Sequence, residues 1–321
     1  MFTQILIVVF VGALGSAALY GLHRLVTYVA AVSRTPPPEE PAPPSEPSAP
    51  VFADGLVYLF AHEFVRAPHE HQRTHARRQV FAPLTGEERD PRDLGEQILF
   101  ATLVRLHDEG LIELRLEECE PSFFPPFPHK RWTMLLGRRG PLPPSPVADV
   151  LGRGLDMLEA KLEKQGQLRP YVVPLDEAVE HAIRIARQEL TFWQRAGVYA
   201  DLRSYVEDAL IAQGYLITPA RETWLERARQ TRPQIHEEAV RELEPAAVAL
   251  RRSLERFRDT HGRPPPEGPL PDQHPRTLAD VDPAIITEEF VPGEMPLYDC
   301  LRISIHEALA NLRQVEPSEE V

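Results

Sequence analysis

The sequence predicts a mostly helical fold with small β-hairpins, joined by a proline-rich stalk to an amino-terminal transmembrane helix. Three observations support this prediction. Apolar residues recur at helical spacing in several long segments, a helix–glycine–strand pattern occurs twice, and an uncharged run near the amino terminus is followed by a stretch rich in proline. A chain of 321 residues has room for such an anchor and for one or two domains.

The uncharged run predicts a membrane-spanning helix. It covers residues 5–22 (ILIVVFVGALGSAALYGL), and these 18 residues would rise about 27 Å as a helix, close to the thickness of the bilayer's hydrocarbon core. Apolar residues return at 25–32, so residues 5–32 are expected to enter the membrane. The competing interpretation is a secretory signal peptide that is cleaved near residues 29–31.

The flanks of this run predict its orientation. Arg24 and Arg34 follow it, whereas residues 1–4 contain no Lys or Arg, so the positive-inside bias places the body of the protein in the cytoplasm. Within the run, small residues at 13, 17 and 21 are spaced by four, which would let two such helices approach closely and form a homodimer. After the run, residues 35–50 (TPPPEEPAPPSEPSAP) favour an extended stalk, because proline-rich chains adopt polyproline II.

The helix–glycine–strand pattern organises the rest of the chain. Residues 94–117 combine apolar side chains at helical spacing, Gly110 as a helix stop, and alternating apolar and charged residues from 112 on. Residues 202–217 repeat the pattern with Gly214 in the equivalent place. Glycine suits both stops because it enters the left-handed conformation without steric cost. Each copy therefore predicts a helix that turns directly into a strand.

A hairpin is expected after the first copy. Residues 131–136 are strand-like and should pair with 111–117, which makes the proline-rich residues 118–130 the connecting loop, called here the wing. Further helices are expected over 51–66, 148–165, 175–196, 219–229, 234–260 with a break at Pro245, and 296–315. Residues 67–92 read as polar and irregular. The predicted divisions are a transmembrane anchor at 1–34, a linker at 35–50, a first unit at 51–146, a helical second unit at 147–261, a proline-rich loop at 262–295, and a last helix with an acidic tail at 296–321.

Composition narrows the classes of function. The formal net charge of −13 argues against general binding to nucleic acid, which requires a basic surface. The two cysteines, Cys119 and Cys300, lie far apart in sequence, as in a cytosolic protein with reduced thiols rather than a disulfide scaffold. The sequence contains no Walker A, GxSxG, GxGxxG or HExxH pattern, so no catalytic residue and no cofactor is expected.

Two kinds of side chain are candidates for binding. Phe123, Phe124 and Phe127 stand among the prolines of the wing, where they would either contact a partner or the membrane surface, or fold back over the core. Basic residues with aromatic neighbours suit an anionic headgroup, whereas nearby acids would make the same residues a solvated surface. The basic clusters are Lys130, Arg131 and Trp132 with Arg138 and Arg139, and Arg73, Arg77 and Arg78.

A histidine cluster provides a weak metal candidate. His69, His71 and His75 lie close together in sequence, and His71 and His75 have the i, i+4 spacing that places two imidazoles on one helix face. His62 would supply a further ligand. The alternative is a solvated loop with scattered histidines, so no metal site is assigned.

The order of these elements resembles tandem winged-helix proteins. In the stretches ATLVRLHDEGLIEL and DLRSYVEDALIAQGYLI, the chain also resembles the Golgi phosphoprotein 3-like family, over residues 94–230. That resemblance implies two winged-helix-like units and binding of an acidic lipid headgroup at a basic surface that contains Trp. The proline-rich wing and the amino-terminal span depart from the family's pattern.

Three functions remain open at this point. The first is a single-pass, membrane-anchored cytoplasmic scaffold or adaptor that binds an unknown protein partner without chemistry of its own. The second is a membrane-tethered winged-helix DNA-binding regulator, for which Arg105, Lys130 and Arg131 should be exposed together. The third is a metal-dependent enzyme that uses His62, His69, His71 and His75, for which the imidazoles should converge.

Overall fold

The computed structural model describes residues 50–68, 80–118, 132–166, 171–190, 198–217, 234–262 and 296–315. These residues belong to one compact unit, Pro47–Val321, and the remaining Met1–Glu46 form a second unit outside the described residues. In the described residues the fold is mostly helical with small antiparallel sheets, as the sequence predicts. No helix of the described part is long and apolar enough to cross a membrane, and the expected span at 5–32 lies outside that part.

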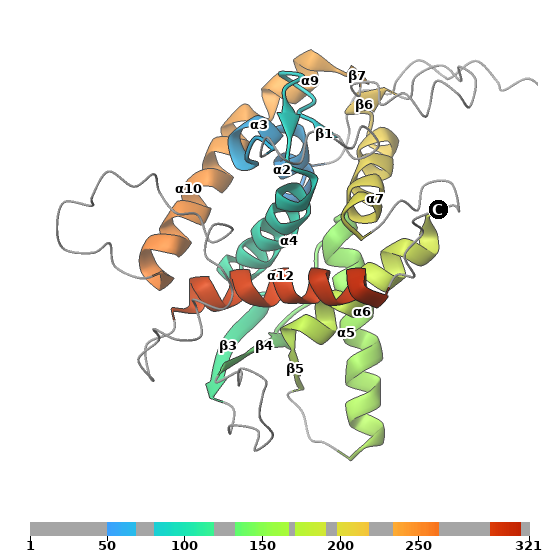
Figure 1. The fold of residues 1–321 in the computed structure, drawn as a ribbon, viewed down its shortest axis with the longest axis vertical. Helices are drawn as coiled ribbons and strands as arrows, with labels where there is room; N and C mark the ends of the chain where they lie inside the picture. Colours follow the sequence, from blue (N-terminus) through green and yellow to red (C-terminus); the bar gives the residue numbers. More distant parts are fainter. Residues whose placement is uncertain are drawn as a thin grey trace, which may run out of the picture. The chain divides into compact units, whose positions relative to one another are not determined.

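The helix α4 (Pro91–Asp108) runs through the middle of this unit, with α2 (Ala53–Leu59), α7 (Val198–Ala212), α10 (Glu244–His261) and α12 (Leu297–Val315) packed around it (Figure 1). Ile98, Leu103 and Leu106 are each at most 1% exposed. A helix that is apolar on nearly all sides is stable only when neighbours cover it, which explains its central position.

The sequence placed the start of α4 three residues too late. Asp90 caps the helix by accepting hydrogen bonds from the backbone N–H of Arg92 (2.9 Å) and Asp93 (3.5 Å), and Pro91 occupies the first turn. Proline is well suited to this position, because its missing N–H would have no partner inside the helix.

The predicted repeat of the helix–glycine–strand pattern is confirmed at the level of hydrogen bonds. Gly110 has a φ of 69°, and Leu111 N–H donates to the Leu106 carbonyl at 2.9 Å. After α7, Gly214 has a φ of 82°, and Tyr215 N–H donates to the Leu210 carbonyl at 2.9 Å. Both helices therefore end in a Schellman motif. Each then leads into a strand, β3 (Ile112–Glu118) or β6 (Leu216–Ile217).

Replacing Gly110 by alanine should destabilise the protein through the backbone alone. A Cβ at this position would meet nothing within 4 Å, so the cost is that of holding an L-residue in the left-handed region, about 1–2 kcal/mol. The shift of the urea unfolding midpoint, followed by circular dichroism, measures it. Gly110→Asn should lose less, because asparagine tolerates this conformation better. Equal losses for the two variants would contradict the assigned cause.

The predicted hairpin is present. The strand β4 (Trp132–Arg138) pairs antiparallel with β3, in a register that runs from Ile112 opposite Arg138 to Glu118 opposite Trp132. Ile112 and Leu114 point into the core, whereas Arg115 is exposed, which is the alternation that the sequence indicates. A third strand, β5 (Val172–Pro174), pairs with β4. It is too short to leave a periodic signal and was not predicted.

Several other elements correct the predicted boundaries. The segment 51–66 forms two short helices, α2 and α3 (Ala61–Phe64), instead of one, and 67–92 contains a small hairpin of β1 (Val80–Phe81) and β2 (Glu88–Arg89). Residues 234–235, expected to start a helix, form β7 (Gln234–Ile235), because their backbone groups pair antiparallel with β6. The helix that was expected to end near residue 196 is α6 (Leu175–Glu189), after which Leu190 is extended.

The remaining helices agree with the sequence. They are α5 (Pro146–Lys164), α9 (Glu237–Glu242), α10 and α12, and Pro245 stands in the first turn of α10, where the predicted break occurs. The helices α5 and α6 approach closely at Gly154, where a Cβ would lie 3.1 Å from the backbone nitrogen of Ala182. The expected helix at 219–229 lies outside the described residues.

Candidate functional site

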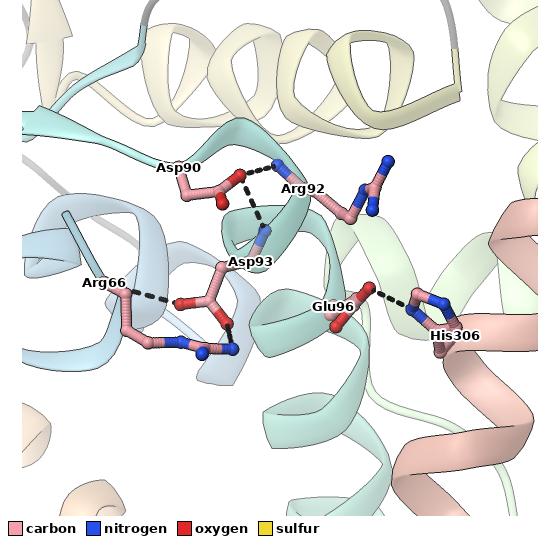
Figure 2. A network of polar contacts seen from close by, with 6 residues as sticks. All are labelled: Arg66, Asp90, Arg92, Asp93, Glu96 and His306. Carbon is pink, nitrogen blue, oxygen red and sulfur yellow. Dashed lines mark hydrogen bonds and ion pairs between the residues drawn. The ribbon is translucent and has the colours of Figure 1, made fainter. Parts of the chain in front are cut away.

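A network of polar contacts at the amino-terminal end of α4 joins three separate parts of the chain (Figure 2). Asp93, in the first turn, is 3% exposed and accepts hydrogen bonds from Arg66, from the backbone N–H at 2.7 Å and from Nη2 at 3.3 Å. The Arg66 carbonyl in turn accepts a bond from the Asp90 N–H at 2.9 Å. The chain that follows α3 is thereby fixed to the start of α4, because a buried carboxylate is stable only when it is paired and hydrogen-bonded.

The other side of the same helix turn contacts the carboxy-terminal helix. His306 on α12 lies with Nδ1 2.8 Å from Oε1 of Glu96, and Figure 2 shows the imidazole pointing at the carboxylate from across the interface. The hydrogen bond with Glu96 raises the pKa of His306, and desolvation by burial opposes this rise. Nearby, the Arg92 guanidinium lies 5.9 Å from the ring centre of Tyr199 on α7. These groups can exchange a proton, and they hold α4 to the chain after α3, to α7 and to α12.

Two further buried aspartates have the same architectural role. Asp54, in the first turn of α2, accepts bonds from the N–H groups of Gly55 and Val147, each at 2.8 Å, and so connects α2 to the first turn of α5. Asp201, in the first turn of α7, is fully buried and lies 3.3 Å from Nε of Arg187 on α6. A cavity of about 10 Å³ beside Asp54 has room for no more than one water, so it is not a ligand pocket.

Most of the binding residues predicted from sequence lie outside the described residues. This group contains Phe123, Phe124, Phe127, Lys130, Arg131, Arg73, Arg77 and Arg78. Trp132 is described: it is the first residue of β4 and packs, half-buried, against the core. The register that pairs Glu118 with Trp132 makes residues 119–131 the connection between the two strands, so Glu118 belongs to β3 rather than to the wing.

Two arginines of the basic cluster around Trp132 have acidic partners. Arg138 lies 2.6 Å from Asp156 and 2.8 Å from Glu159, both on α5, and Arg139 forms an ion pair with Glu113. These carboxylates offset the positive charge that the sequence assigned to this surface. Arg138 and Arg139 therefore contribute little net charge for an anionic headgroup.

The described part of the chain contains no group of three or more His, Cys, Asp or Glu residues placed to hold a metal ion. His62 lies on α3 with Nε2 3.8 Å from Glu63, and His69, His71 and His75 fall outside the described residues. The metal hypothesis is thus left with one described histidine.

Sequence reasoning missed the polar groups that connect the helices. Asp90 followed by Pro91 is a helix-start signal that would have placed Asp93 in a first turn. For Asp54 and Asp201, only their positions at the beginning of apolar segments pointed to this role. No sequence signal indicated the contact between Glu96 and His306, because 210 positions separate them. Comparison of the chain with protein-family models, with curated proteins and with solved structures found no match.

Proposed function

We propose that this protein is a membrane-tethered scaffold or adaptor that binds a protein partner in the cytoplasm and has no catalytic activity. The observation that carries the proposal is the order of segments along the chain. An uncharged run at 5–22 is followed by Arg24 and Arg34, then by the proline-rich stalk at 35–50, and the compact unit begins at Pro47. A run of this length suits a bilayer span, and a polyproline spacer would hold the unit away from the membrane.

We further infer that the unit contains two winged-helix-like parts. The first consists of α4, β3 and β4, and the second of α7, β6 and β7. In support, α4 and α7 end in the same Schellman motif, and each leads into an antiparallel pair of strands. In the first part, the wing would connect β3 to β4 and present Phe123, Phe124 and Phe127 as the contact for the partner.

Contact with a protein is favoured over contact with DNA by the surroundings of α4. In a DNA-binding winged helix, the helix before the hairpin enters the major groove. Here that helix is covered by neighbours, and its last turns expose Arg105, Asp108 and Glu109. Arg105 is paired with Glu109 at 2.6 Å, so this strip offers acids rather than free cations to a phosphate backbone.

Site-specific photo-crosslinking of the full-length chain in intact cells tests the proposal. A photoreactive phenylalanine analogue at position 123 or 127 is expected to give a discrete protein adduct, and the membrane fraction should contain it. The same analogue at Arg252, an exposed residue of α10, provides the matched control and should give no such adduct. Deletion of residues 5–32 should move the chain to the soluble fraction. An adduct with DNA, or identical adducts at all three positions, would refute the proposal.

A further inference from the structure

The carboxy-terminal helix α12 lies across the unit and covers α4, α6 and β4 (Figure 1). Its inner face buries Leu301, Ile305 and Leu309, each at most 1% exposed. Near its beginning, the Tyr298 ring meets the Phe100 ring of α4 edge-on at 5.4 Å between centroids. These contacts are apolar or aromatic, so their strength changes little with pH.

One contact of α12 with α4 is ionisable. The Nδ1–H of His306 donates to Oε1 of Glu96 over 2.8 Å, while the carboxylate is only 13% exposed and the imidazole 43%. Glu96 therefore sits where water competes weakly for it, whereas His306 can still exchange a proton with solvent. A charged donor makes a stronger hydrogen bond to a carboxylate than a neutral one does.

We propose that the His306–Glu96 pair is a proton-dependent clasp, which fixes α12 to α4 at neutral and mildly acidic pH and binds it more weakly as the pH rises. Its effect reaches the whole helix, because α12 packs as one amphipathic element and loosening its inner face opens the surface of α4 and α6 beneath it.

On balance, the groups around His306 raise its pKa, which favours the charged imidazole. Glu96 of α4 raises the pKa of His306 most, Glu307 of α12 raises it further, and Arg92 of α4 and partial burial lower it. Several charged groups on or beside the other elements that pack against α12 form ion pairs with one another rather than with His306. These pairs are Arg187 with Asp201 on α6 and α7, Arg138 with Asp156 and Glu159 on β4 and α5, Glu113 with Arg115 and Arg139 at the β3–β4 hairpin, and Arg258 with Asp259 on α10.

A pKa that is higher in the folded state than in the unfolded chain sets the sign of the effect. The clasp contributes fully below the ordinary histidine pKa of 6.5 and its contribution falls as the pH rises through the raised folded value. Acidification from neutral pH towards 6.5 thus does not weaken the charged imidazole's contribution to this contact.

Hydrogen–deuterium exchange of the full-length chain in detergent tests the clasp. Between about pH 6 and pH 8.5, after correction for intrinsic exchange, the protection factors of α12 amides should fall about threefold relative to those of α5 amides, a figure that allows for solvent screening at the half-exposed imidazole. His306→Gln keeps an N–H donor without a titrating charge, and it should remove this pH dependence. His181→Gln, at a half-buried histidine of α6 whose Nδ1 lies 2.9 Å from the Glu177 carbonyl of the same helix, is the matched control and should retain it.

A second measurement uses the wild-type chain, so it gives a result even if His306→Gln folds poorly. Nuclear magnetic resonance titration of the His306 imidazole in the wild-type chain should give a midpoint above the ordinary histidine value of 6.5, and Glu96→Gln should lower the His306 midpoint. Protection of α12 that does not change with pH in the wild type, an unchanged pH dependence in His306→Gln, or a His306 midpoint at or below the ordinary 6.5 would each overturn the proposal.

Discussion

Replacing Leu103 by alanine is expected to lower the free energy of unfolding by about 2–5 kcal/mol. Leu103 lies in the middle of α4 and is 1% exposed, within the continuous core that α2, α7, α10 and α12 form around this helix. Truncation removes the buried methyl groups and leaves a cavity that rigid helices on several sides cannot fill. The change in the urea unfolding midpoint of the full-length chain, followed by circular dichroism at 222 nm, measures the loss.

The matched control for this variant is Met157→Ala on α5. Met157 is a large apolar residue in a helix as well, but its side chain is 57% exposed. Its replacement should change the free energy of unfolding by no more than about 0.5 kcal/mol. If Leu103→Ala cost no more than Met157→Ala does, α4 would not be the centre of the core.

Replacing Asp54 by alanine is expected to cost about 2–3 kcal/mol, although Asp54 is a charged residue in a short helix. Its carboxylate is 1% exposed and accepts two backbone N–H groups, from Gly55 and Val147. Alanine would leave both donors buried without a partner, and it would remove the carboxylate that lies in the first turn of α2 and against the first turn of α5, where the helix dipole favours an acid. Urea unfolding near neutral pH measures the loss.

Asp54→Asn separates the hydrogen bonds from the charge. Asparagine retains one acceptor oxygen but directs an NH₂ group at the other N–H donor. The free energy of unfolding of Asp54→Asn at neutral pH should therefore lie between that of the wild type and that of Asp54→Ala. Burial raises the pKa of Asp54 above its ordinary 3.8, against the lowering effect of the hydrogen bonds from Val147, Gly55 and Ser145. The folded state therefore holds this proton at a higher pH than the unfolded chain does, and this group's contribution to stability falls as the pH rises from 3.8 through the folded pKa.

The difference in stability between Asp54→Asn and the wild type should consequently become larger on acidification, because only the wild type gains stability from that protonation. A parallel series of unfolding midpoints at about pH 4 and pH 7 checks it. A difference that stays constant between the two pH values would show that Asp54 has the same pKa in the folded and unfolded chain.

The features of the fold that the sequence predicted correctly depend on local patterns. The stops at Gly110 and Gly214 and the pairing of β4 with β3 were all predictable, because each depends on a few adjacent residues or on a simple alternation. The two-residue strand β7 was missed because Ile235 continues, in sequence, the apolar stripe of the helices that follow. Only pairing with β6 makes these residues a strand.

The candidate binding residues, unlike these elements of the fold, do not follow from a local sequence pattern. The wing phenylalanines and most of the basic residues were chosen by residue type, and their role as contacts for a partner remains a prediction. Arg138 and Arg139 show why residue type is insufficient, since their acidic partners on α5 and β3 come from other parts of the chain. The charge of a surface is decided by what the fold places beside each cation.

By itself, the sequence determined where α4 and α7 end, which strand returns on β3, and the predominance of helix, since hydrogen bonding within a few residues dictates these features. The tertiary structure alone decided which polar groups meet. Asp54 reaches the first turn of α5, Asp93 holds Arg66, and Glu96 faces His306 only after the apolar faces have packed. Pairing over such separations depends on the packed positions of whole helices, and no pattern of neighbouring residues encodes it.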